Sequence, residues 1–299
     1  MDAGTDGLHG TAPVHRKHCS GGQPSLFPVK IFHQYPHAAL SPFIDRLWGW
    51  ESVSPEPVRL PTLLPGTGAE LYVHYGEPFR IETRGGPPAA VDRGHLFCIR
   101  NTPIPLSPAS GIGFVAVRFK IGMLRRFTNL PANELADSRL CVHDLWGVAG
   151  TRLAQQLSGA AGHRERIALL QRFLLRHLRT ESEDLPVEQA MGLLYRQGTA
   201  LSIDALAGGA NLGRRQFERR WQKFSGQSPS EVKGLIRFQR AVRQLMIIPS
   251  AGVADTALAC GYFDQAHFIH DFRRRVGMAP GHYLRLARDK THFYNTPLR

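Results

Sequence analysis

The sequence predicts an α+β protein, with a β-rich N-terminal domain capped by helices and an all-α C-terminal domain. Two observations predict this division. Before about residue 130, several short segments alternate apolar and polar residues with period two, as strands do. Beyond it the apolar period is helical, and the last third contains one helix-turn-helix pattern twice, with a connector helix between the copies. We expect the β-rich domain to be of the cupin or jelly-roll type.

The composition is that of an ordinary globular protein, with 299 residues of which 42% are apolar and 20% charged. No apolar run approaches the roughly 18 residues of a membrane helix, and the N-terminal segment lacks the apolar stretch of a secretory signal. Cys19, Cys98, Cys141 and Cys260 lie far apart without a paired motif, which is typical of a reducing compartment. We therefore expect a soluble, cytoplasmic protein with no membrane partner.

The chain divides into four predicted parts. These are a flexible tail at 1–30, the β-rich domain with its C-terminal helices at 31–180, the double helix-turn-helix domain at 186–289 and a second tail at 290–299. The predicted hinge is the acidic segment TESEDLP, which ends in a proline.

The strands of the β-rich domain are predicted from alternation. Leu71 and Val73 alternate with Tyr72 and His74, and a turn at 76–78 precedes a second strand near Arg80. Further strands are expected at 94–100 and 113–120, with the Pro-Gly clusters LPGTG and RGGPP as turns between strands. The tryptophans of the WGW segment at 48–50 are expected in the core.

Two or three helices are predicted to close the first half of the chain. One apolar stripe at helical spacing comprises Ile167, Leu170, Phe173, Leu174 and Leu178.

The duplicated motif is the most informative feature of the sequence. The first copy has Ala207, Phe217 and Trp221 followed by GQSP, and the second has Ala257, Phe268 and Phe272 followed by GMAP. A small residue lets two helices cross closely, and the aromatic residues at four-residue spacing form one buried face. Each copy therefore predicts a helix, a tight turn and a second helix, with Ser202 and Asp264 as helix N-caps.

The opposite face of the second helix in the first copy is rich in arginine. It carries Arg215, Glu218, Arg219 and Gln222. Guanidinium groups on such a helix pair bidentately with guanine in a major groove, whereas a merely solvated face is the alternative interpretation. From residue 202 onward the chain holds 16 Lys and Arg against 7 Asp and Glu, which is +9 of the total +13. This concentration of positive charge favours a nucleic-acid partner.

The connector between the copies carries its own helix signals. Ser228 and Glu231 form a capping box, and Pro229 stands at the first helical position. A helix from Ser230 to Met246 would be roughly 25 Å long. Because adjacent major-groove entries lie about 34 Å apart, one chain can occupy two of them.

These segments resemble the AraC/XylS family of bacterial transcription regulators. The resemblance runs from LSIDALAGGANLGRRQFERRWQKFSGQSP through RFQRA to GYFDQAHFIHDFRRRVGMAPGHYLR. It implies sequence-specific binding to promoter DNA, usually with activation of transcription and RNA polymerase as a partner. The segments SPFIDRLWGW, LLPGTGAEL and VRFKIGM resemble a sensor-like domain of one uncharacterised branch of this family. That resemblance implies a regulatory or homodimerising role, or a small-molecule effector, without naming one.

The resemblance also implies which residues contact DNA. Base-reading positions fall on Arg215, Glu218, Arg219, Gln265, His267 and His270, and phosphate-contacting positions on Arg214, Lys223, Arg273 and Arg274. Three positions depart from the family pattern. Ala266 stands where serine is usual, Thr256 where isoleucine is usual and His270 where arginine is usual. Histidine reaches less far than arginine, so we expect a weaker contact from the second unit.

A metal-dependent enzyme of cupin type, fused to a DNA-binding module, is an alternative. Its ligands would come from His74, His95, Cys98 and His143. Only His95 and Cys98 are close in sequence, and a separation of three on a strand puts them on opposite faces. We therefore expect no metal, no cofactor and no enzymatic activity. Sequence-independent DNA binding is the remaining alternative, and it would depend on salt but hardly on base sequence.

Overall fold

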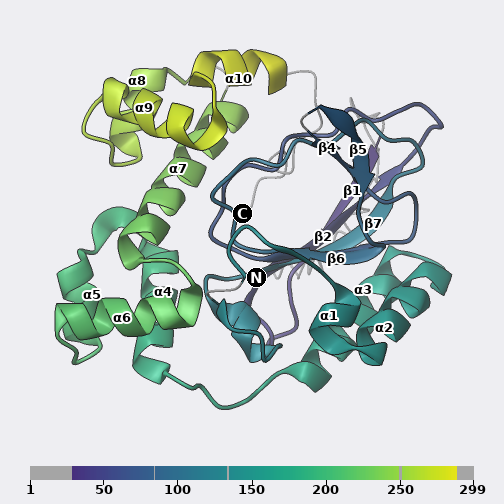
Figure 1. The fold of residues 1–299 in the computed structure, drawn as a ribbon, viewed down its shortest axis with the longest axis horizontal. Coiled ribbons are helices and arrows are strands. Elements are labelled where there is room, and N and C mark those ends of the chain that lie inside the picture. The colour runs from purple at the N-terminus through teal and green to yellow at the C-terminus, as the bar shows by residue number, and fades with distance from the viewer. Residues whose placement is uncertain (1–28, 84, 133–134, 249–250, 288–299) are drawn as a thin grey trace, which may run out of the picture.

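The computed structural model describes residues 29–83, 85–132, 135–248 and 251–287, and Figure 1 shows a β-rich domain beside a helical one. The α+β architecture is therefore confirmed. The tails predicted at 1–30 and 290–299 lie outside the described residues, except that Val29 and Lys30 already belong to the first strand. No helix in the described part of the chain is long and apolar enough to cross a membrane.

One six-stranded antiparallel sheet forms the centre of the N-terminal domain, in the order β1-β2-β7-β3-β6-β8. Its strands are β1 (Val29–Gln34), β2 (Ile44–Ser52), β3 (Glu70–His74), β6 (Gly94–Phe97), β7 (Gly113–Phe119) and β8 (Arg139–Cys141). The predicted alternation along β3 is confirmed: Leu71 and Val73 pack in one core cluster, and Tyr72 packs in the cluster on the other face.

A hairpin corrects one prediction. Strands β4 (Arg80–Thr83) and β5 (Gly86–Ala90) pair with each other, so the RGGPP cluster, predicted as a turn, in fact enters a strand. Gly85 has φ 73°, a conformation that glycine adopts without strain. The prolines of β5 are tolerated because this exposed strand pairs on one side only.

Three helices cover one face of the sheet, as predicted, and Figure 1 shows them packed together against it. They are α1 (Val142–Trp146), α2 (Val148–Gly159) and α3 (His163–His177). Ile167, Leu170 and Leu174 of α3 are buried in the same cluster as Leu71 and Val117. Helix α3 therefore holds its apolar stripe against the sheet.

The other face of the sheet carries an aromatic core that includes the WGW segment. Trp48 and Trp50 are buried there, together with Tyr72, Phe79 and Phe114. A Cβ atom on Gly49 would lie 2.2 Å from the carbonyl oxygen of Phe114, so only glycine fits between the two tryptophans. The expectation that both tryptophans lie in the core is confirmed.

Two buried histidines stack within this aromatic core. The rings of His74 and His95 are 5.2 Å apart, and both residues are fully buried. The Nδ1 of His95 lies 2.8 Å from the carbonyl of Asp92, whereas neither ring nitrogen of His74 has a hydrogen-bond partner in the described structure. Burial, and then the neighbouring His95 and Arg93, hold the pKa of His74 well below its usual value. Burial is also the main reason that the pKa of His95 falls to about 4.

This pair predicts an acid-sensitive N-terminal domain. The pKa of each histidine is lower in the folded than in the unfolded state. Their contribution to the unfolding free energy is therefore fully present above about pH 6.5 and is lost as the pH falls. For His95 alone the loss at pH 4 is about 3 kcal/mol. We expect His74→Phe to reduce the decline in unfolding free energy between pH 7 and pH 5, measured by urea titration. The exposed His143, changed to Phe, is the control, and an unchanged decline in His74→Phe would contradict the assignment.

The C-terminal domain is entirely helical in the described residues. Its helices are α4 (Leu185–Gln197), α5 (Ile203–Gly209), α6 (Arg214–Ser225), α7 (Pro229–Ile247), α8 (Val253–Ala259), α9 (Gln265–Val276) and α10 (Pro280–Ala287). Figure 1 shows α7 running as a diagonal rod between the α5–α6 pair and the group α8–α10.

The two domains share apolar contacts at two places. After β7, Ile121 and Met123 pack in the core cluster that contains Met191 of α4 and Phe224 of α6. Between them Gly122 has φ 71°, and a Cβ atom there would lie 2.6 Å from the sulfur of Met191. In the second place Leu64 belongs to the core cluster of α7, α8 and α9. The N-terminal domain therefore contacts both halves of the helical domain.

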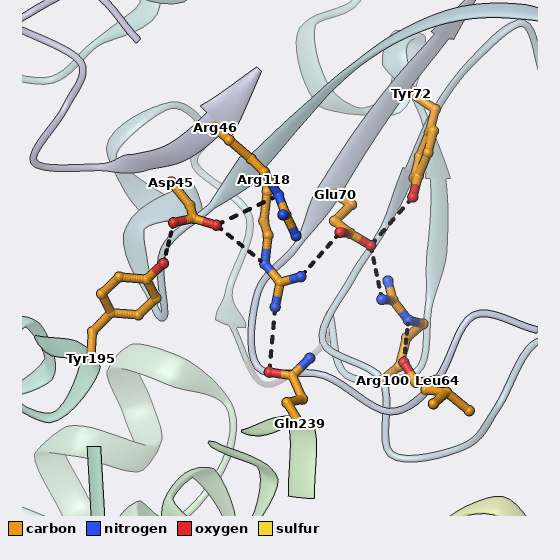
Figure 2. Close-up of polar contacts among 9 residues, drawn as sticks. All are labelled: Asp45, Arg46, Leu64, Glu70, Tyr72, Arg100, Arg118, Tyr195 and Gln239. Atoms are coloured by element: carbon orange, nitrogen blue, oxygen red, sulfur yellow. Dashed lines mark hydrogen bonds and ion pairs between the residues drawn. The ribbon is translucent and has the colours of Figure 1, made fainter. Parts of the chain in front are cut away.

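Figure 2 shows a network of charged and polar side chains around Glu70. Glu70 is 5% exposed, and its carboxylate lies 2.9 Å from Arg100 and 3.4 Å from Arg118. Burial alone would raise the pKa of Glu70, but Arg100, Arg118 and Arg46 outweigh that effect and lower it. Glu70 is therefore ionised, and the positive charges of the neighbouring arginines compensate its charge.

This network extends into the helical domain. Arg118 donates a hydrogen bond of 3.3 Å to Gln239 of α7, and its Nε lies 3.8 Å from Asp45. Asp45 in turn accepts a hydrogen bond from the hydroxyl of Tyr195 in α4 (Figure 2). The same set of side chains thus ties α4 and α7 to the sheet.

Candidate DNA-binding surface

Helices α5 and α6 form the first helix-turn-helix unit. Ser202 caps α5, as predicted, because its hydroxyl accepts a hydrogen bond of 3.0 Å from the amide of Ala205. The turn contains Asn211 at φ 54°, which asparagine tolerates better than most residues. Phe217, Trp221 and Phe224 of α6 are buried in the core cluster of this unit, with Ala207 where the two helices meet.

The outward face of α6 carries the predicted base-reading residues of this unit. Arg215 and Arg219 are exposed, and neither forms an ion pair within the described part of the chain. Arg214 instead bonds both Asp204 and Glu218, each at 3.1 Å. Arg215 and Arg219 therefore present unpaired guanidinium groups, whereas the carboxylate of Glu218 is paired with Arg214 of the same helix.

Helices α8 and α9 form the second unit, followed by α10. Asp264 caps α9, as predicted, by accepting a hydrogen bond of 2.7 Å from the amide of His267. Phe268 and Phe272 are buried. Gln265, His267 and His270 are exposed, as predicted, and helical periodicity puts the two histidines on the side of α9 away from Phe268 and Phe272.

Asp271 of α9 is buried. It is 5% exposed and accepts a hydrogen bond of 2.9 Å from the hydroxyl of Tyr262. Burial would raise the pKa of Asp271, yet hydrogen bonds from Arg274 and Arg275 lower it. Arg274, predicted to contact phosphate, is exposed but already lies 2.8 Å from this carboxylate.

Arg273 and Lys223, the remaining predicted phosphate contacts, are both exposed. The side chain of Arg273 has no ion-pair partner among the described residues. Lys223 lies near the N-terminal domain, because its carbonyl accepts a hydrogen bond of 3.2 Å from Arg125.

Helix α7 holds the two units together. Its predicted capping box is present: the Ser228 hydroxyl accepts from the amide of Glu231, and the Glu231 carboxylate accepts from the amide of Ser228. The N-terminal half of α7 packs Val232 and Ile236 into the first unit, and its C-terminal half packs Phe238 and Val242 into the second. Its 19 residues span about 28 Å, so the helix fixes the separation of the two units.

A groove of about 560 Å³ separates the N-terminal half of α7 from α9. His267, His270 and Arg274 line it on the α9 side. On the α7 side stands Arg237, which sequence reasoning missed. Its guanidinium lies 4.3 Å from the centre of the Tyr262 ring and donates to the carbonyl of Gly261. Arg237 therefore braces the turn before α9, and its position in the middle of the connector gave no local signal of this contact.

The residues considered for a metal do not converge. His74 and His95 stack in the aromatic core, whereas Cys98 packs in the cluster on the other face of the sheet. His143 is exposed and bonded to Thr151. In the described ranges no group of three or more His, Cys, Asp or Glu side chains is arranged to hold a metal ion.

Two segments of the chain match known protein families. Residues 206–286 match the family described as a helix-turn-helix domain, and residues 33–141 match a domain of unknown function, DUF6597. The HTH-type transcriptional regulator GbdR of Pseudomonas aeruginosa is 36% identical over 80 residues, which are 27% of this chain and 22% of that protein. The match thus spans less than a quarter of the relative's length.

Similar solved structures include two regulators. One is a transcriptional regulator with an AraC-type DNA-binding domain from Chromobacterium violaceum, at 26% identity over 35% of this chain and 93% of that one, with a TM-score of 0.32. The other is ToxT from Vibrio cholerae O395, at 13% identity over 87% of this chain and 97% of that one, with a TM-score of 0.41.

Proposed function

We propose that this chain, a member of the AraC/XylS family of bacterial transcription regulators, controls transcription by binding promoter DNA sequence-specifically. One observation carries the proposal. Two helix-turn-helix units share the rigid helix α7, and each presents an exposed polar face on its second helix. Helices of this kind enter the major groove, and a connector about 28 Å long is comparable to the roughly 34 Å between successive groove segments.

Each unit has its own proposed base-reading residues. In α6 these are Arg215, Glu218 and Arg219, and in α9 they are Gln265, His267 and His270. The phosphate contacts proposed are Arg214, Lys223, Arg273 and Arg274. Two of these need a change of partner, because Arg214 and Arg274 form ion pairs with carboxylates of their own domain.

Arg273 tests the phosphate contacts. We expect Arg273→Ala to weaken binding to cognate and random duplexes by similar factors, and to lower the slope of log affinity against log salt by about one. A salt titration by fluorescence anisotropy measures both quantities. Arg152→Ala on α2 removes the same charge from an exposed site in the other domain and is the control. An unchanged salt slope in Arg273→Ala would remove this residue from the DNA contact.

The experiment that tests the function is selection of bound fragments from genomic DNA, followed by competition between a recovered site and random duplex. We expect a defined site that outcompetes random DNA by about a thousandfold or more. Equal competition by both duplexes would favour sequence-independent binding instead.

The N-terminal domain has a proposed regulatory role in the cytoplasm. Activation through RNA polymerase, response to a small-molecule effector and homodimerisation are the forms that this role can take in the family. Side chains of the aromatic core fill the space over the sheet face that carries Tyr72. We therefore expect an effector to act at the domain boundary rather than within that core.

A further inference from the structure

A loop of the N-terminal domain reaches the groove between α7 and α9. Asn101 lines that groove together with His267 and His270. Its side-chain carbonyl accepts a hydrogen bond of 2.6 Å from Gln227, in the turn between α6 and α7. The two domains therefore meet beside the predicted base-reading face of α9.

We propose that the Asn101 loop is an autoinhibitory contact, which keeps DNA from the second recognition helix until the N-terminal domain moves away. This inference rests on the proposed function.

Steric and electrostatic arguments support the proposal. A helix inserted in the major groove, which is about 12 Å wide, has a phosphate strand along each of its flanks. His267 and His270, which are proposed to read bases, line the groove between α7 and α9 together with Asn101. DNA whose bases reach these two histidines would therefore bring a phosphate strand against the Asn101 loop.

The Asn101 loop is held in place by an acidic residue of a neighbouring segment, Asp137. The carboxylate of Asp137 accepts a hydrogen bond of 2.7 Å from the amide of Asn101, a second from its side-chain amide and a third from the amide of Thr102. Asp137 is exposed, so its charge would repel an approaching phosphate. The loop cannot easily move by itself, and the whole domain would have to shift.

Polar contacts as well as apolar ones hold the domain in place, and single substitutions can remove the polar ones. Tyr195 bonds Asp45, and Gln239 bonds Arg118, which is anchored by the buried Glu70 (Figure 2). Each such hydrogen bond contributes a small part of the stability of the closed arrangement. Loosening one of them should raise the population of the open arrangement and, with it, the apparent affinity for DNA.

The test uses the full chain and its selected DNA site. We expect Tyr195→Phe, Gln239→Ala and Asn101→Ala each to bind that site about 3- to 10-fold more tightly than wild type. None of the three changes the charge, so the salt slope should stay constant. Site preference should also stay constant.

Tyr75→Phe is the matched control, because the Tyr75 hydroxyl bonds Glu51 within the N-terminal domain. It should leave DNA affinity unchanged. Thermal unfolding of each variant shows whether it is folded. Unchanged or weaker binding by folded Tyr195→Phe and Asn101→Ala would overturn the autoinhibitory contact. A wild-type protein without any site preference would instead overturn the proposed function.

Discussion

Replacing Glu70 by Ala is expected to lower the unfolding free energy of the N-terminal domain by about 3 to 5 kcal/mol. The carboxylate neutralises Arg100 and Arg118 and lies close enough to Arg46 for all three to lower its pKa. Removing it leaves buried guanidinium groups without that compensating charge, and one nitrogen of Arg100 already lacks a hydrogen-bond partner in the described structure. Urea unfolding followed by tryptophan fluorescence measures the loss, because Trp48 and Trp50 lie in this domain.

Two further variants separate charge from volume. Glu70→Gln keeps the shape of the side chain and removes the charge, so we expect most of the loss to persist. Glu56→Ala removes an exposed carboxylate and should change stability by less than about 0.5 kcal/mol. If Glu70→Ala unfolded at the same urea concentration as Glu56→Ala, the buried network would have no net role in stability.

Arg219→Ala, or Arg215→Ala, is expected to cost about 1 to 3 kcal/mol of binding free energy on a cognate site and to relax base preference in one segment of it. Both guanidinium groups are exposed on α6 and unpaired in the described structure, so no internal ion pair has to break before they bind. Loss of a bidentate contact should fall mainly on the matching base pair. Affinity for random duplex should change much less.

Arg220→Ala is the control for these variants. Arg220 lies on the same helix, but its guanidinium forms two hydrogen bonds, of 2.6 and 2.7 Å, with Asp184 at the start of α4. We expect its loss to reduce stability and to leave base preference intact. Equal losses on cognate and random DNA in Arg215→Ala and Arg219→Ala would contradict direct base reading by α6.

Local signals predicted the helical domain well. The caps at Ser202, Ser228 and Asp264 depend on residues three positions apart, and the structure contains all three. The apolar spacing likewise predicted that Phe217 and Phe268 would be buried. Each of these features joins residues within about one turn of helix, so both partners lie within a few positions of each other in the sequence.

Features that depend on distant partners were missed. Strand β5 was missed because its Gly-Pro composition is typical of turns, whereas its pairing with β4 on an exposed edge tolerates proline. The stack of His74 on His95 depends on the register of β3 against β6. Glu70 is 30 residues from Arg100 and 48 from Arg118, so no periodicity connects them.

The candidate site was predicted in part. The exposed positions of Arg215, Arg219 and His270 follow from helical periodicity and are confirmed, whereas their contacts with DNA stay predictions. The burial of Asp271 could not be predicted from helical periodicity, because it depends on hydrogen bonds to partners outside the apolar stripe of α9. Its partners include Tyr262, nine residues away across the turn before α9.

Sequence-specific reading by two helices is tested most directly by selecting DNA sites with wild type, Arg219→Ala and His270→Ala in parallel. We expect a wild-type site with two segments about 10 base pairs apart. Arg219→Ala should lose preference only in the segment read by α6, and His270→Ala only in the segment read by α9. Loss of preference in both segments from either variant, or a wild-type site with one segment, would contradict independent reading by two recognition helices.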